Sequence, residues 1–186
     1  MGFDDRLVEI TRERHRLVID LAYAGAGNLT GRPIYANACC LLRREAEPGL
    51  RRAVELAALC GLGLKILDAY RPPRAQERIW QWLPDPRYVA RGGSGNHSRG
   101  VALDLTLVDG AGEALDMGTA FDAMVDLSRP FHPDLPPGPQ RNRLWLLGIM
   151  TQAGFRQSDT EWWHYQLPDA HTFPVIDDDR ISCRTD

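Results

Sequence analysis

The chain has 186 residues, which suits one compact domain with a sizeable hydrophobic core. Apolar residues make up 44% and charged residues 25%, and the net charge of -3 comes without a basic block or stripe, which argues against a nucleic-acid-binding protein. The sequence contains no run of the ~18 apolar residues that a membrane span requires, and its charged N-terminus has no signal-peptide core. We therefore expect no membrane segment and a cytoplasmic location.

The N-terminal part combines a polar opening with one strand pattern. Residues 1–14 are rich in charge, and we expect a loose arm or a short helix there. Over residues 15–23, Leu17, Ile19 and Leu21 alternate with polar neighbours, which predicts a strand. A turn-rich stretch with several glycines follows this strand.

The middle of the chain carries the clearest helix pattern. Leu50, Val54 and Ala57 share one helical face, and Gly61 follows as a stop signal. Two prolines after Arg71 end a short apolar strand and precede a second helical stretch. We therefore expect, in chain order, a helix, a strand, a helix and a loop over residues 48–59, 64–70, 74–82 and 83–96.

A strand pattern over residues 101–108 places one carboxylate in an apolar setting. Val101, Leu103, Leu105 and Leu107 occupy one face, whereas Asp104 lies on the other. A buried carboxylate without a partner is costly, so a metal ion, an arginine or backbone amides must lie near Asp104.

The C-terminal third predicts a helix over residues 140–153, with Leu144, Leu147 and Met150 on its inner face, and an aromatic-rich strand over 162–167. Residues 169–186 form an irregular tail. Because the strands are short and unevenly linked, we expect an α+β fold with a small, mostly antiparallel central sheet flanked by helices. One domain over residues 1–186 is the natural organisation.

Three separated residues form a candidate metal site. His97, Asp104 and His164 offer two imidazole nitrogens and one carboxylate oxygen, a set that suits one Zn²⁺ ion and leaves a fourth position open. A single histidine at a loop boundary is usually solvated or capping, and only the combination favours a metal. The open position indicates metal-assisted hydrolysis.

Glu161 is the candidate general base beside this metal. On a helix, residues 161 and 164 would share a face, whereas strict strand alternation would separate them. The conflict is resolved if Glu161 lies at the loop entry, before strand pairing begins. The alternative is a surface carboxylate at the start of a strand.

Two further charged residues have weaker signals. Arg71 lies in a stiff Tyr-Arg-Pro-Pro segment and can stabilise an oxyanion, although, taken by itself, a structural salt bridge with Asp68 or another acid is the better interpretation. Asp122 can hold a substrate ammonium group, although an ordinary surface position is the simpler interpretation.

Four motifs of this chain resemble the D-alanyl-D-alanine dipeptidases, the VanX-type zinc enzymes related to D-Ala-D-Ala carboxypeptidases and to the hedgehog-like zinc fold. The motifs begin at Tyr70, His97, Met117 and Glu161, and they read Tyr-Arg-Pro, His-Ser-Arg-Gly-x-Ala-x-Asp, Met-Gly-x-x-Phe-Asp and Glu-Trp-Trp-His-Tyr. The resemblance covers most of the chain, from about residue 23 to residue 165.

The resemblance implies hydrolysis of the small dipeptide D-Ala-D-Ala to two D-alanines. It implies a zinc ion on the two histidines and Asp104, Glu161 as the base that activates zinc-bound water, and Arg71 as the stabiliser of the transition state. It also implies that Asp122 faces the free ammonium of the dipeptide and that Tyr23 lines the pocket.

One departure bears on the substrate. The family usually carries a serine two residues before the first histidine, where this chain has Gly95, with Ser94 one step earlier. The loop over residues 83–96 is also short for the family, which leaves the range of accepted dipeptides open. The alternatives are a D,D-carboxypeptidase or an L,D-endopeptidase acting on peptidoglycan stems, and a non-catalytic zinc-binding module.

Overall fold

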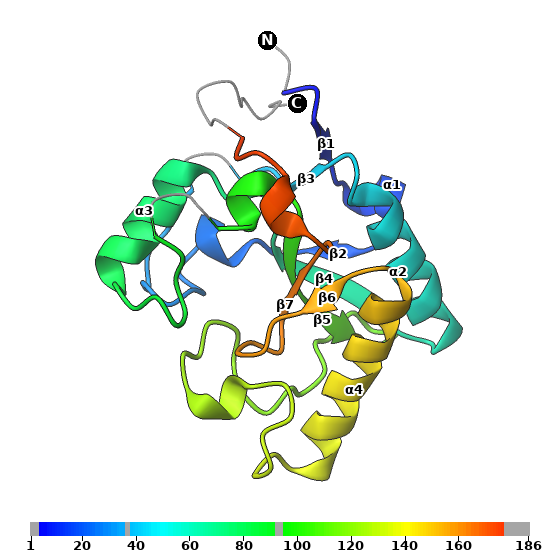
Figure 1. Cartoon of the computed structure of the whole chain (residues 1–186). Coiled ribbons are helices and arrows are strands. Elements are labelled where there is room, and N and C mark those ends of the chain that lie inside the picture. The colour runs from blue at the N-terminus through cyan, green and yellow to red at the C-terminus, as the bar shows by residue number, and fades with distance from the viewer. Residues whose placement is uncertain (1–3, 36–37, 92–94, 177–186) are drawn as a thin grey trace.

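The computed structural model describes residues 4–35, 38–91 and 95–176. A five-stranded sheet lies at its centre, in the order β2-β4-β5-β7-β6, and a separate two-stranded sheet joins β1 to β3 (Figure 1). The strands are β1 (Leu7–Glu9), β2 (Val18–Ile19), β3 (Leu41–Arg43), β4 (Gly63–Asp68), β5 (Ala102–Val108), β6 (Arg156–Gln157) and β7 (His164–Gln166). Among the strands of the described residues, only β2 and β4 pair in parallel. The expected α+β fold with a mostly antiparallel sheet is confirmed.

The part of the chain that the structure describes contains four α-helices: α1 (Arg12–His15), α2 (Glu47–Leu59), α3 (Pro73–Trp82) and α4 (Pro137–Gln152). Helices α2 and α4 pack against each other and against the sheet, whereas α3 lies well away from them, on the left in Figure 1. Leu50, Leu64, Leu105, Leu146 and Met150 belong to the core between α2, α4 and the sheet. In the described part of the chain, no helix has the length and apolar character of a membrane span.

Strand β5 is buried along its whole length, on the face of its leucines and on the face of Asp104 alike. Leu103, Leu105 and Leu107 face the core, as predicted. Asp104 alternates to the other face and is only 2% exposed. The central strand therefore carries a carboxylate into a part of the molecule that water barely reaches.

The N-terminal expectations need correction. Residues 7–15 are not a loose arm, because β1 pairs with β3 and both Leu7 and Ile10 are buried. The alternative, a short helix, is present as α1 and extends to residue 15. Only Val18–Ile19 of the predicted strand over 15–23 pairs in the sheet, and a 3₁₀ turn over Ala22–Ala24 ends it. Tyr23 lies in this turn and is buried.

Helix α4 begins at Pro137, three residues earlier than predicted, because proline is well suited to the first turn of a helix. Its inner face was only partly predicted. Met150 is buried and Leu147 packs against the core, but Leu144 is 49% exposed, and Arg143, Leu146 and Ile149 face inward. The near-continuous apolar run over 144–150 makes the facing direction ambiguous in the sequence. A 3₁₀ turn over Ala170–Thr172 interrupts the expected irregular tail, of which residues 177–186 lie outside the described part.

Candidate active site

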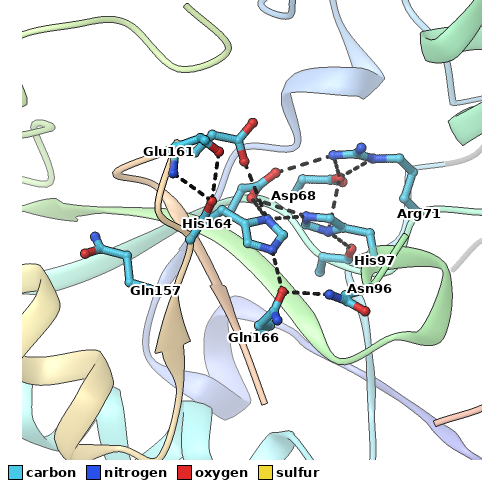
Figure 2. A network of polar contacts seen from close by, with 12 residues as sticks. Asp68, Arg71, Asn96, His97, Gln157, Glu161, His164 and Gln166 are labelled. Carbon is cyan, nitrogen blue, oxygen red and sulfur yellow. Dashed lines mark hydrogen bonds and ion pairs between the residues drawn. The ribbon is translucent and has the colours of Figure 1, made fainter. Parts of the chain in front are cut away.

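The three predicted ligand atoms form a compact triangle. Asp104 and His164 are paired residues on the adjacent antiparallel strands β5 and β7, so their side chains project from the same face of the sheet. His97 enters from the 3₁₀ turn His97–Arg99 that precedes β5. His164 Nδ1 lies 3.0 Å from Asp104 Oδ1 and 3.1 Å from His97 Nε2, and His97 Nε2 lies 3.2 Å from Asp104 Oδ1 (Figure 2).

The dimensions of this triangle fit a metal ion. Zinc bonds of about 2.0–2.1 Å in a tetrahedron separate neighbouring ligand atoms by about 3.3 Å. All three spacings lie close to that value, and all three residues line the pocket. The donor set of two imidazoles and one carboxylate is also the set that zinc prefers in hydrolytic sites.

Hydrogen bonds on the far side of each imidazole orient the two rings. His97 Nδ1 lies 2.7 Å from the carbonyl oxygen of Ala69, and His164 Nε2 lies 3.1 Å from Oε1 of Gln166. Both partners accept hydrogen bonds, so the outer nitrogen of each ring carries the proton. Gln166 Oε1 is itself fixed by a 2.7 Å bond from Nδ2 of Asn96 (Figure 2). The inner nitrogens therefore face the triangle and are the candidate ligand atoms, an arrangement common in zinc sites.

The electrostatic environment of the triangle favours positive charge. Burial by itself would raise the pKa of Asp104, but the two histidines outweigh it and hold the pKa of this carboxyl well below its usual range. Burial opposes the charged form of His164, yet the hydrogen bond and charge of Asp104 raise the pKa of this imidazole to about 9. Positive charge is thus favoured at this point.

Glu161 borders the triangle. Its Oε2 atom lies 4.0 Å from Nδ1 of His164, and its side chain is largely buried. Burial raises the pKa of Glu161 to about 7; His164 lowers it, and the carboxylates of Asp104 and Asp122 raise it further. A carboxyl group with a pKa near neutrality can both accept and release a proton, which is what general acid–base catalysis requires.

Arg71 lies on the other side of the triangle and is buried. Its Nε atom donates to Asp68 Oδ2 at 2.8 Å, and its Nη2 atom lies 3.4 Å from Asp104 Oδ2. The ring of Tyr23 lies under the guanidinium, 4.7 Å from its central carbon. The expected salt bridge with Asp68 is therefore present, and it holds the arginine at the rim of the site.

The simpler interpretation of Asp122, an ordinary surface position, is wrong. The residue is 8% exposed, its Oδ2 atom accepts a hydrogen bond of 3.1 Å from the backbone amide of Leu29, and it also bonds the side chain of Tyr23. Burial raises the pKa of Asp122 to about 6. Its backbone has φ = 59°, in the left-handed region that Asp and Asn tolerate best among residues with a side chain.

All seven predicted site residues line one pocket of about 450 Å³, a size suited to a small molecule. Residues 86–90 and 157–161 form other parts of its wall, and Gly95 also lines it, whereas Ser94 lies outside the described residues. Sequence reasoning missed Gln76, Asn96 and Gln166. A usable signal existed for Gln166, which follows His164 by two and so shares its face of the strand.

The chain is similar to known proteins in sequence and in fold. A model of the peptidase M15 family, described as D-ala-D-ala dipeptidase, matches residues 4–185. The D-alanyl-D-alanine dipeptidase of Escherichia coli K12 is 50% identical over 168 residues, which cover 90% of this chain and 86% of that protein. The D-alanyl-D-alanine dipeptidase of Enterococcus faecium is 35% identical and covers 83% and 88%. Among solved structures, the LdcB LD-carboxypeptidase has a similar fold, with a TM-score of 0.51, 16% identity and coverage of 89% and 69%.

Proposed function

Because the chain belongs to the peptidase M15 family of D-Ala-D-Ala dipeptidases, and is thus a metallopeptidase, we propose that it hydrolyses the free dipeptide D-Ala-D-Ala to two D-alanines. One observation carries this proposal most directly. Glu161, with a pKa raised to about 7, lies beside the His97–Asp104–His164 triangle in a pocket large enough for a dipeptide.

His97, Asp104 and His164 would hold one zinc ion. When bound, zinc supplies Lewis-acid polarisation of a carbonyl and lowers the pKa of coordinated water. The carboxylate of Asp104 offsets part of the positive charge, and the bonds from Ala69 and Gln166 keep the imidazoles in ligand orientation.

Glu161 is the proposed general base and general acid. Its carboxylate takes a proton from the attacking water as the new C–O bond forms at the dipeptide carbonyl. It then delivers that proton to the departing nitrogen as the C–N bond breaks. The balance is one water consumed and two D-alanines released, with Glu161 returned to its starting form.

Arg71 is the proposed stabiliser of the negative oxygen in the tetrahedral intermediate. Its guanidinium is held by Asp68 and Tyr23 before any substrate arrives. A charge that is fixed in advance needs no reorganisation during the reaction, and in a pocket sheltered from water its effect on an oxyanion is large.

Asp122 and Tyr23 are the proposed recognition elements for the substrate ammonium. A buried carboxylate whose pKa is raised to about 6 gains by pairing with a cation. This feature favours a free dipeptide over a peptidoglycan stem, because a carboxypeptidase substrate has an amide in place of that ammonium.

Hydrolysis of three substrates by the zinc-loaded protein tests the proposal: D-Ala-D-Ala, L-Ala-L-Ala and N-acetyl-D-Ala-D-Ala. We expect cleavage of the free D,D-dipeptide alone. Cleavage of the acetylated peptide at a comparable rate would move the protein to the carboxypeptidase class. No cleavage of any of the three would favour the non-catalytic zinc module. The cytoplasmic location and the single domain stay predictions.

A further inference from the structure

Gln76 joins two parts of the pocket and has no role in the mechanism above. It lies in the first turns of α3, and side chains in a helix lean toward its N-terminus, which here points back to Arg71. Gln76 Oε1 accepts a hydrogen bond of 2.9 Å from Nη1 of Arg71, and Gln76 Nε2 donates one of 2.8 Å to the carbonyl oxygen of Ala90. The residue is only 2% exposed. A buried glutamine with both ends bonded is fixed in one orientation.

The bond to Gln76 completes the positioning of the guanidinium. Asp68 engages Nε and Nη2 of Arg71, both at 2.8 Å, along one edge of the group. Nη1 lies outside that contact and is held by Gln76. With a partner on each side, the guanidinium plane is fixed in direction as well as in place. The direction of its donors determines how well they meet a developing oxyanion.

The bond to Ala90 ties the same side chain to the pocket wall. Residues 86–90 line the pocket, and Val89 packs with Tyr23 and Ile79 in a small buried cluster. Ala90, whose carbonyl accepts the bond from Gln76, follows the buried Val89 directly and is itself exposed. Gln76 therefore connects Arg71, on one side, to the end of the pocket wall formed by residues 86–90, on the other.

We propose that Gln76 is a positioning residue that aligns the Arg71 guanidinium and couples it to the pocket wall formed by residues 86–90. Its acceptor end sets the direction of the arginine, and its donor end holds the wall. The proposal rests on the proposed function of Arg71. Because the two ends act on different parts of the pocket, substitutions that remove one or both bonds separate their effects.

Two variants make this separation. Gln76→Met has a similar length and removes both bonds. Gln76→Glu keeps an oxygen acceptor for Arg71 but sets a carboxylate oxygen against the Ala90 carbonyl. We expect Gln76→Met to lower kcat by about 10- to 100-fold and to raise KM. We expect Gln76→Glu to raise KM while kcat stays close to wild type. Gln81→Met, which changes an exposed glutamine of the same helix, is the matched control and should leave both constants unchanged.

A double-mutant comparison separates positioning from a merely structural effect. In an Arg71→Ala background, Gln76→Met should cause no further loss of kcat, because the group that it aligns is gone. Equal kcat losses in Gln76→Met and Gln76→Glu, or an unchanged loss in the Arg71→Ala background, would overturn the assignment. So would a Gln76→Met enzyme with wild-type constants.

Backbone hydrogen exchange gives a readout that does not depend on activity. Amides of residues 87–91 should exchange faster in both Gln76 variants than in the wild type and Gln81→Met, since both variants lose the donor to Ala90. Unchanged exchange would overturn the coupling to the wall, even if Gln76→Met did not yield active enzyme. A wild-type protein that cleaves no dipeptide, or an Arg71→Ala variant with normal kcat, would instead count against the proposed function.

Discussion

Glu161 Oε2 lies 4.0 Å from Nδ1 of His164, although the two residues are three apart at the start of a strand. Strand β7 begins only at His164, and Trp162 and Trp163 form a turn before it. Alternation therefore does not apply between residues 161 and 164. The buried indoles of Trp162 and Trp163 pack edge to face and fix this turn, so the carboxylate returns to the metal triangle.

Because Glu161 lies beside the three ligands and is not one of them, its contribution to catalysis can be tested without removing a metal ligand. We expect Glu161→Ala to keep bound zinc and to lose about 10²- to 10⁴-fold in kcat, because the base is gone while the three ligands remain. Zinc content and turnover should be measured on the same sample. Glu55→Ala, which removes an exposed glutamate of α2, is the control. Turnover near the wild-type level would remove Glu161 from the mechanism.

The ligand triangle predicts a different outcome for His164→Ala. Removing one of three protein ligands leaves two donors, and we expect purified His164→Ala to contain little zinc after dialysis. Elemental analysis against the wild type measures this directly. The comparison variant is His171→Ala, which changes an exposed histidine and should stay fully loaded. A His164→Ala protein with one zinc per chain would show that the ligand assignment is wrong.

The central strands and the presence of helices α2 and α4 could be predicted because their hydrophobic patterns identify the type of element clearly. The alternation in β5 separates Leu103 and Leu105 from Asp104, and α2 has one apolar face interrupted by polar positions. The inner face of α4 was not fully predicted, because Arg143 is buried in it. Its guanidinium donates to the backbone carbonyls of Met117, Leu127 and Arg129, which is invisible in a hydropathy pattern.

The site residues could be predicted from motifs, but the hydrogen bonds that hold them in place could not. That His97 faces the carbonyl of Ala69 depends on how the segment before α3 meets the turn before β5. The burial of Asp122 depends on the backbone amide of Leu29, 93 residues away in sequence. Such contacts follow from tertiary packing, so residue type and spacing do not predict them.

Arg71→Lys tests whether the shape of the guanidinium matters beyond its charge. A lysine cannot bond Asp68 and Gln76 together while pointing a donor at the substrate. We expect kcat to fall by about 10²- to 10³-fold, with a smaller change in KM. Arg52→Lys, at an exposed ion pair on α2, serves as the control. A lysine variant with nearly normal kcat would mean that charge alone suffices.

Arg71 also contributes to stability. Asp68 is fully buried, and besides Arg71 it bonds the hydroxyl of Tyr35 at 2.5 Å. Arg71→Ala leaves this carboxylate without its cation, which we expect to lower the free energy of unfolding by about 3–5 kcal/mol. Urea denaturation of the metal-free proteins measures the difference. A loss below about 1 kcal/mol would indicate that solvent or another group compensates Asp68.

Asp122 predicts a stability difference that depends on pH. Burial raises its pKa from 3.8 to about 6 in the folded protein, so the folded state binds this proton more tightly than the unfolded state. Ionised Asp122 therefore costs stability: the cost is absent below about pH 4, grows between pH 4 and 6, and reaches about 3 kcal/mol above pH 6. Asp122→Asn keeps a neutral group, and asparagine tolerates the left-handed backbone at this position.

We therefore expect Asp122→Asn to be more stable than the wild type at pH 8, by up to about 3 kcal/mol, and nearly equal to it at pH 4. Urea unfolding of both proteins with a chelator present measures the difference without a contribution from metal release. The charge of Asp122 also raises the pKa of Glu161, so part of the gain expected for Asp122→Asn at pH 8 comes from the loss of that repulsion. An equal difference at both pH values would show that Asp122 does not titrate in this range, and a less stable Asp122→Asn at pH 8 would mean that its charge is already paired.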